Sequence, residues 1–337
     1  MTRFNLSVAI LACSLAMSSI AAHAEVRYRL TPLDPSLTAS TQVTDLNNGG
    51  EVVGNDGAGR AFLWNGELVD LGTVLDPESP VSRANAINDG SDIVGTFLDG
   101  LGVTHNFLLQ DGEVITIQVI GNRPVIPSDI NNLRQVVGTT FDEQFVQHGF
   151  IWQDGQAELL EAPSGSTFGA IAAVNNRGVA VGAAFVGDTT RAVVWKDGEP
   201  RFIGPAGTHA VAINDREQVL VEPEWLPGVT SIWKNGELKP LPALSGSLGT
   251  MIARDINNRG QVVGLSSMPN GTSTATLWHG DVAIDLNDRI AADDPLRPFV
   301  RLAAAFLIND RRQIVAFGPD SRAADGHFRF YLLTPAD

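Results

Sequence analysis

Apolar and polar residues follow one another in short blocks along the chain, and one block pattern returns seven times. It consists of an apolar residue, an asparagine, two or three turn-forming residues, a polar residue and an aliphatic pair that often ends in glycine. The first copy is Leu46–Gly54 and the third is Ile130–Gly138. A period of roughly 40 to 50 residues indicates a repeat architecture. The repeated asparagines stand at positions 47, 88, 131, 175, 214, 257 and 309, at intervals of 41, 43, 44, 39, 43 and 52 residues.

A second pattern follows each copy of the first, and it is an apolar run, most often with tryptophan, that leads into a tight turn. Examples are Ala61–Gly66 and Phe150–Gly155. Asn-Gly and Asp-Gly between apolar runs are strong hairpin signals. Each repeat therefore predicts four short strands, of which the second and third are apolar without alternation and should be buried on both faces. Helical periodicity is absent.

Four strands in each period predict the blade of a β-propeller. The seventh repeat stops after its third strand, near Thr334, whereas an unassigned strand, Val26–Leu30, precedes the first repeat. The sequence thus predicts an all-β, seven-bladed β-propeller with four antiparallel strands per blade, in which the N-terminal strand completes the last blade and leaves no open edge. The long interval before Asn309 predicts a loop around Asn287–Pro298.

The N-terminus has the pattern of a cleavable signal peptide. A basic start, Met1–Arg3, precedes the apolar stretch Phe4–Ile20 and the small-residue site Ala22–Ala24. We expect residues 1–24 to be a signal peptide, residues 25–337 to be a single propeller domain, and the protein to be secreted or periplasmic. An alternative is lipid attachment at Cys13, the one cysteine of the chain. With cleavage after Ala24, disulfides and thiol chemistry are excluded.

The formal net charge of the whole chain is −15. This charge disfavours nucleic acid and anionic membranes as partners, because both require a basic surface. Solubility through self-repulsion is the simplest explanation of the charge. We expect a monomer without a cofactor and without membrane insertion.

The apolar run of each repeat begins with a further recurring motif. It reads His148-Gly149-Phe150 in the third repeat, His105-Asn106-Phe107 in the second and Arg60-Ala61-Phe62 in the first. Joined to the asparagine hairpin, this order resembles the HAF repeat family, named for His-Ala-Phe, over nearly all of residues 25–337, although no copy reads His-Ala-Phe in full. The resemblance implies an exported repeat protein of bacteria, and it brings no catalytic residues with it.

Two groups of recurring polar residues are candidates for chemistry. The seven asparagines suggest either a ligand-binding rim or turn capping, and turn capping is favoured because asparagine caps its own backbone. His105, His148 and His327 share one phase of the repeat and would bind zinc only if they converged. They belong to the second, third and seventh repeats, so we expect them to lie apart and predict no metal site.

The remaining candidates lie outside the repeat pattern. Asp293-Asp294 or Glu222 with Glu224 could serve as an acid–base pair on a glycan, although an acidic surface produces such pairs by chance. Trp225 stands on a proline-bounded segment, where it either binds a partner or folds back on the core; the other five tryptophans should be core residues. No catalytic residue is assigned.

We therefore expect a non-enzymatic binding module for an extracellular or cell-envelope protein or glycan. Trp225 is the candidate binding residue. The alternatives are a propeller-hosted hydrolase or lyase acting on a carbohydrate or lactone, and a structural component of the cell envelope.

Overall fold

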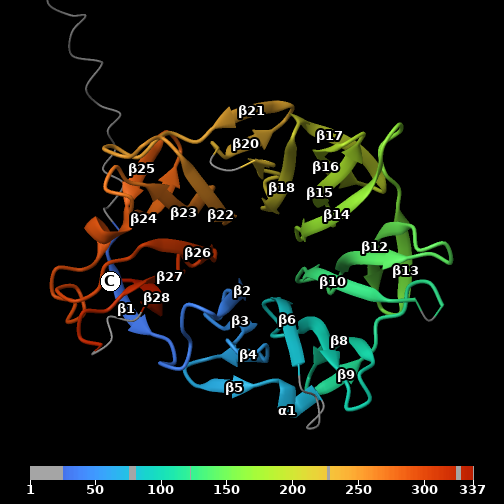
Figure 1. The fold of residues 1–337 in the computed structure, drawn as a ribbon, viewed down its shortest axis with the longest axis horizontal. Coiled ribbons are helices and arrows are strands. Elements are labelled where there is room, and N and C mark those ends of the chain that lie inside the picture. The colour runs from blue at the N-terminus through green and yellow to red at the C-terminus, as the bar shows by residue number, and fades with distance from the viewer. Residues whose placement is uncertain (1–25, 76–80, 122, 226–227, 324–327, 337) are drawn as a thin grey trace, which may run out of the picture.

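Seven four-stranded antiparallel sheets stand in a ring around a central opening in the computed structural model (Figure 1). It describes residues 26–75, 81–121, 123–225, 228–323 and 328–336. The predicted all-β, seven-bladed β-propeller is confirmed. The predicted signal peptide, residues 1–24, and Cys13 within it lie outside the described residues.

Blades 1 to 6 each take four consecutive strands, and blade 7 combines the two ends of the chain. The first three blades are β2 (Gln42–Leu46), β3 (Val52–Asn55), β4 (Ala61–Trp64) and β5 (Leu68–Asp70); β6 (Val81–Ile87), β7 (Ile93–Leu98), β8 (Thr104–Gln110) and β9 (Glu113–Ile115); and β10 (Val125–Ile130), β11 (Val136–Phe141), β12 (Gln147–Gln153) and β13 (Gln156–Leu160). Blades 4 to 6 are β14 (Thr167–Val174), β15 (Ala180–Val186), β16 (Thr189–Lys196) and β17 (Glu199–Ala206); β18 (Thr208–Ile213), β19 (Val219–Pro223), β20 (Ser231–Lys234) and β21 (Glu237–Pro240); and β22 (Met251–Ile256), β23 (Gln261–Ser267), β24 (Ser273–His279) and β25 (Val282–Asp285). Blade 7 is β26 (Ala304–Ile308), β27 (Ile314–Pro319), β28 (Phe328–Pro335) and β1 (Tyr28–Pro32).

The ring closes as the sequence predicts, because β1 pairs antiparallel with β28. Tyr28 lies opposite Pro335, and Pro32 lies opposite Tyr331. The N-terminal strand is therefore the outermost strand of blade 7. This pairing joins the two ends of the described chain in one sheet and covers the edge of β28.

The glycine that ends the repeat motif has a steric cause. The innermost strand of every blade shifts register against its neighbour, twice in blade 4 and once in each of the others. In blade 2 this bulge brings the carbonyl oxygen of Arg83 to 1.9 Å from where a Cβ of Gly95 would stand. A side chain does not fit there. The same close approach occurs at Gly54, Gly138, Gly182 and Gly264.

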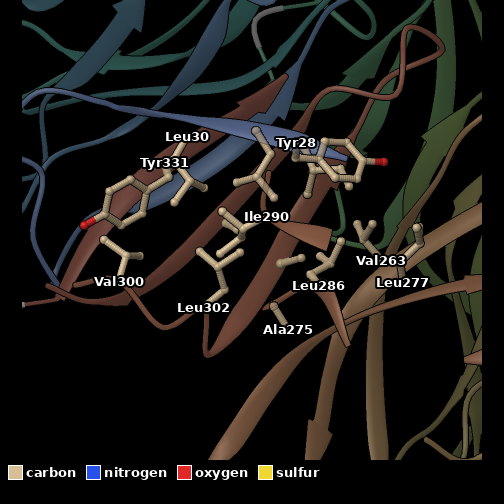
Figure 2. Packing of buried hydrophobic residues seen from close by; sticks show 14 of the residues in the cluster. Tyr28, Leu30, Val263, Ala275, Leu277, Leu286, Ile290, Val300, Leu302 and Tyr331 are labelled. Atoms are coloured by element: carbon tan, nitrogen blue, oxygen red, sulfur yellow. The ribbon is translucent and has the colours of Figure 1, made fainter. Parts of the chain in front are cut away.

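The segment between blades 6 and 7 is predicted as a loop around 287–298, and the structure corrects this prediction in part. A 3-10 helix, η1 (Leu286–Arg289), covers its start, and Asp285 accepts a hydrogen bond from the N–H of Asn287 as its N-cap. Leu286 and Ile290 are buried together with Tyr28 of β1 (Figure 2). Leu296 belongs to the same buried cluster. The inserted segment thus adds to the core between the last two blades.

The core lies between neighbouring blades, as the unbroken apolar strands predict. Trp64, Trp152, Trp195, Trp233 and Trp278 are all buried, which confirms their assignment to the core. A short helix, α1 (Gly72–Leu75), follows β5 and was not predicted. None of the helices in the described part of the chain is long and apolar enough to cross a membrane.

Candidate functional site

Each repeated asparagine caps the turn between the first and second strands of its blade. The Oδ1 of Asn131 accepts hydrogen bonds from the backbone N–H groups of Leu133 and Gln135, and its Nδ2 donates to Oε1 of Gln135. Turn capping is therefore confirmed. The fourth residue of every such turn has a positive φ, between 56° and 86°, whether it is glycine or not. These turn residues are Gly50, Ser91, Arg134, Gly178, Glu217, Gly260 and Arg312.

The asparagines also join the blades in a closed ring, a role that their sequence pattern does not show. The Nδ2 of each one donates to the backbone carbonyl of the equivalent asparagine in the next blade, at 2.9 to 3.2 Å. The ring closes where Asn309 of blade 7 donates to Asn47 of blade 1. All seven side chains are buried to at least 95%. Their amide groups are occupied within the protein, which argues against a ligand-binding role.

A second ring lies one residue further along each turn. There the backbone N–H donates to a side-chain oxygen of the equivalent residue in the next blade, through all seven blades. The residues are Asn48, Asp89, Asn132, Asn176, Asp215, Asn258 and Asp310. No two aspartates are neighbours in this ring, so each carboxylate accepts from an adjacent asparagine amide rather than facing another carboxylate.

Three more carboxylates line the central channel, a cavity of about 290 Å³. They precede the repeated asparagine by two residues, and each bridges two blades through backbone N–H groups. Asp45 Oδ1 accepts from Leu46 at 2.7 Å, and its Oδ2 accepts from Ile87 of blade 2 at 2.8 Å. Asp129 bridges blades 3 and 4 in the same way, and Asp255 bridges blades 6 and 7. The polar groups that line the channel are therefore hydrogen-bonded within the protein and hold adjacent blades together.

Burial raises the pKa of these three carboxyls above the usual range of aspartate. Repulsion from Asp129 and Asp255 adds to the rise at Asp45, whereas the two backbone N–H donors of each carboxyl oppose it. The pKa of Asp255 rises to about 6. At neutral pH the proton kept by Asp45, whose pKa rises to about 8, reduces the mutual repulsion of the three carboxyls.

These pKa values predict how stability depends on pH. The folded protein keeps protons that the unfolded chain, with aspartate pKa values near ~3.9, releases. The free energy of unfolding should therefore fall as the pH rises from about 4 through about 6, by ~3 kcal/mol for Asp255 alone. Urea unfolding of the parent and of Asp255→Ala at several pH values measures this fall in stability. Alanine is a suitable replacement because blades 2, 4 and 5 carry alanine at the equivalent position (Ala86, Ala173 and Ala212). The variant should lose stability at low pH and show the flatter profile. Parallel profiles would contradict the assignment.

The histidines lie in separate pairs, as the repeat phase predicts. His105 Nε2 lies 2.8 Å from Oδ2 of Asp99 in blade 2, and His148 Nε2 lies 3.1 Å from Oδ2 of Asp142 in blade 3. His327 falls outside the described residues. Among those described, no three histidine, cysteine or acidic residues form a group able to hold a metal.

The members of each candidate acid–base pair make separate contacts. Asp293 pairs with Arg29, whereas Asp294 is buried and accepts from the N–H groups of Leu30 and Leu296. Glu224 reaches blade 4, where it accepts from Thr189 and Thr190. Glu222 is buried beside His209, with 3.6 Å between Oε2 and Nε2, and its Oε1 has no hydrogen-bond partner within the described structure.

Opposite the asparagine turns lies a second surface, the hairpin face, formed by the hairpins between second and third strands and by the connections between blades. It carries the four most exposed large apolar side chains of the described chain: Leu101 at 92%, Trp225 at 79%, Phe145 at 75% and Leu248 at 62%. Leu101, Phe145 and Trp225 stand on hairpins of blades 2, 3 and 5, and Leu248 on the connection from blade 5 to blade 6. Apolar side chains that cluster on one surface mark interaction sites, whereas single exposed ones are normal.

Trp225 is on this face and does not fold back on the core. Replacing it with serine should change the free energy of unfolding by less than about 0.5 kcal/mol, because an exposed side chain contributes little to the fold. Thermal unfolding of the variant measures this. As a control, Trp233→Ser removes a buried tryptophan and should cost about 3 to 5 kcal/mol. A loss at Trp225 comparable to the loss at Trp233 would place it in the core.

Sequence reasoning missed the three channel aspartates and Phe145. The channel aspartates had a visible signal in the sequence, since Asp-x-Asn recurs at Asp45, Asp129 and Asp255. The signal for Phe145 is weaker. It stands in a hairpin turn where the related hairpins have glycine, and only the backbone angles show what that implies.

Comparison with known proteins supports the fold. No protein-family model matches the chain, and no curated protein matches its sequence. A puromycin-hydrolysing peptidase of Mycobacterium tuberculosis is similar in structure, with a TM-score of 0.52 and 13% identity over 89% of this chain and 55% of the peptidase. This chain therefore spans about half of that protein.

This chain matches two further structures over almost their whole length. The β-propeller domain of the Trilobed protease from Pyrococcus furiosus has a TM-score of 0.53 and 11% identity over 88% of this chain and 96% of the domain. YCF48 bound to D1 peptide has a TM-score of 0.51 and 11% identity over 92% and 96%. At sequence identities this low, the structural similarity shows the propeller fold and nothing more. The Pyrococcus domain is described as having an open velcro topology, whereas β1 and β28 pair in this chain.

Proposed function

We propose that this propeller is a non-catalytic binding module that docks an extracellular or cell-envelope protein or glycan on its hairpin face. The observation that carries the proposal is that the most exposed apolar side chains gather on that face, while the polar groups of the channel bind one another. The resemblance to HAF repeat proteins, which implies export, supports the location.

One observation favours an enzyme instead. The buried carboxylate of Glu222 has an oxygen without a hydrogen-bond donor, next to His209, and unpaired buried carboxylates occur at catalytic sites. A hydrolase or lyase acting on a carbohydrate or lactone would use such a group as its acid or base. Turnover abolished in Glu222→Gln, with folding intact, would establish that candidate.

A thermal-shift screen of residues 25–337 tests the binding module. The panel holds oligosaccharides, cell-wall fragments, and divalent cations with and without chelator. A ligand at a hundredfold its Kd stabilises by ~2.7 kcal/mol, which raises Tm by several degrees. The shift should disappear when Leu101, Phe145 and Trp225 are all replaced by serine. A shift that survives this triple replacement, or one that depends on a metal, contradicts binding at the hairpin face.

A further inference from the structure

Four hairpins of the hairpin face share one turn, and a single residue departs from its pattern. In each turn the N–H of the fourth residue donates to the carbonyl of the first. The fourth residue is Gly59 in blade 1, Gly102 in blade 2 and Gly271 in blade 6, with φ of 81°, 80° and 78°. In blade 3 it is Phe145, with φ of 60°.

No contact of Phe145 in the described structure offsets the energetic cost of its backbone conformation. A residue with a Cβ pays roughly 1 kcal/mol or more in the left-handed region, and glycine avoids that cost. Phe145 is also 75% exposed, so burial does not offset the strain. Its one ring contact among the described residues is with Arg123, whose guanidinium carbon lies 5.9 Å from the ring centre. Four asparagine turns also carry a residue other than glycine at such an angle, so the angle alone does not indicate function; at an exposed phenylalanine it motivates a functional hypothesis.

The hairpin braces the backbone on both sides of Phe145. Oδ1 of Asp142 accepts from the N–H groups of Gln144 and Val146, on either side of Phe145, and Oδ2 of Asp142 pairs with His148. Val146 is exposed beside it. A loop whose backbone is ordered before binding loses less entropy when it docks.

The neighbouring hairpin of blade 2 is built in the same way. Asp99 accepts from the N–H groups of Leu101 and Val103 and pairs with His105, and both apolar side chains are exposed. The two blades are in contact, because β10 packs against β7 and β8. Four exposed apolar side chains therefore stand on adjacent, similarly braced hairpins: Leu101, Val103, Phe145 and Val146.

Blade 1 shows that the turn itself requires none of these side chains. Asp56 accepts from the N–H groups of Ala58 and Arg60, as in blades 2 and 3. Its tip is Gly57–Gly59, and Arg60 stands at the histidine position and pairs with Asp70. The apolar tips and the histidines occur together in blades 2 and 3, so they are additions to a turn that forms without them.

We infer that Phe145, with Leu101, Val103 and Val146, is the docking surface for a partner protein that offers an apolar pocket rimmed by lysine and arginine. The charge follows from Asp99, Asp142 and Glu143, which flank the apolar tips and outnumber Arg123 beside Phe145, on a chain of net charge −15. A second copy of the chain would meet its own charge, and an anionic membrane would be repelled. This inference rests on the proposed function and narrows it to blades 2 and 3.

The experiment places a benzophenone amino acid at position 145 or, as a control, at the exposed Ala58 of blade 1, in cells that make the protein. Irradiation should join one basic protein to the chain from position 145 and not from position 58. That protein is then purified and titrated by calorimetry. Phe145→Gly should weaken its binding about 30-fold, as expected for an aromatic anchor worth about 2 kcal/mol, while it raises Tm. Val282→Ser, an exposed apolar change on blade 6 outside the hairpin face, should leave both unchanged.

Opposite effects on affinity and stability separate docking from misfolding. Unchanged affinity in Phe145→Gly, no cross-link beyond that from position 58, or a cross-link to a second copy or to lipid overturns the inference. Affinity that does not fall with added salt overturns the basic partner. If the serine triple variant loses binding of any ligand while Phe145→Gly keeps it, the proposed function stands and the docking surface on blades 2 and 3 does not.

Discussion

Replacing Asn131 with alanine should lower the free energy of unfolding by about 3 to 5 kcal/mol. The change leaves the N–H groups of Leu133 and Gln135 without their partner and removes one of the two donors to the carbonyl of Asn175; each unpaired buried group costs about 1 to 3 kcal/mol. Urea unfolding of the parent and variant, with equal m values, measures the loss.

A matched control separates the turn from the ring. Asp56 caps its turn in blade 1 through two backbone N–H groups, as Asn131 does, but among the described residues it makes no bond to another blade, and it is partly exposed. Asp56→Ala should cost only about 1 kcal/mol. Asn131→Asp keeps the capping oxygen and loses the donor to blade 4, so it should fall between the two alanine variants. Equal losses in Asn131→Ala and Asp56→Ala would show that the ring between blades contributes nothing.

Removal of residues 25–32 should destabilise the protein by more than about 5 kcal/mol, most of the stability of a typical domain. The deletion takes away β1, exposes the edge of β28, and removes Tyr28 and Leu30 from the core between blades 6 and 7; burying two such side chains is worth several kcal/mol. Thermal unfolding and sedimentation of residues 33–337 measure the effect, and the open edge should favour aggregation.

Adding a synthetic peptide of residues 25–36 should restore much of the lost stability, because an open sheet edge accepts a matching strand. Tyr28→Phe is the control, since the Tyr28 hydroxyl is buried without a partner in the described structure and its loss should cost little. A truncated chain as stable as the parent would mean that β1 does not close the ring.

The strands and their number were readable because each blade repeats the same local chemistry. The asparagine turns and the glycine turns depend on local residues and recur from blade to blade, so each copy supports the assignment of the others. The strand at Tyr28 was recognised because the first repeat left it unassigned. The packed segment after Leu286 was not predictable, because its apolar residues follow no strand or helix period. Its burial depends on the space between two blades.

The site was predicted less well than the fold, for a physical reason. The bond from Asn131 to Asn175 spans 44 residues and exists only once the blades stand side by side. The strain at Phe145 depends on a backbone angle, which the sequence does not state. Trp225 was found because it breaks the repeat, and its exposure agrees with one of the two expectations for it.

The most direct test of the account is to titrate the protein recovered at position 145 into two variants, Phe145→Gly and Asn131→Asp, at a temperature where both are folded. The account assigns recognition to the hairpin face and stability to the asparagine ring. It predicts that Phe145→Gly loses affinity about 30-fold and gains stability, while Asn131→Asp loses stability and binds like the parent. Equal affinity losses in the two variants, or a loss confined to Asn131→Asp, would place recognition at the channel and contradict this division.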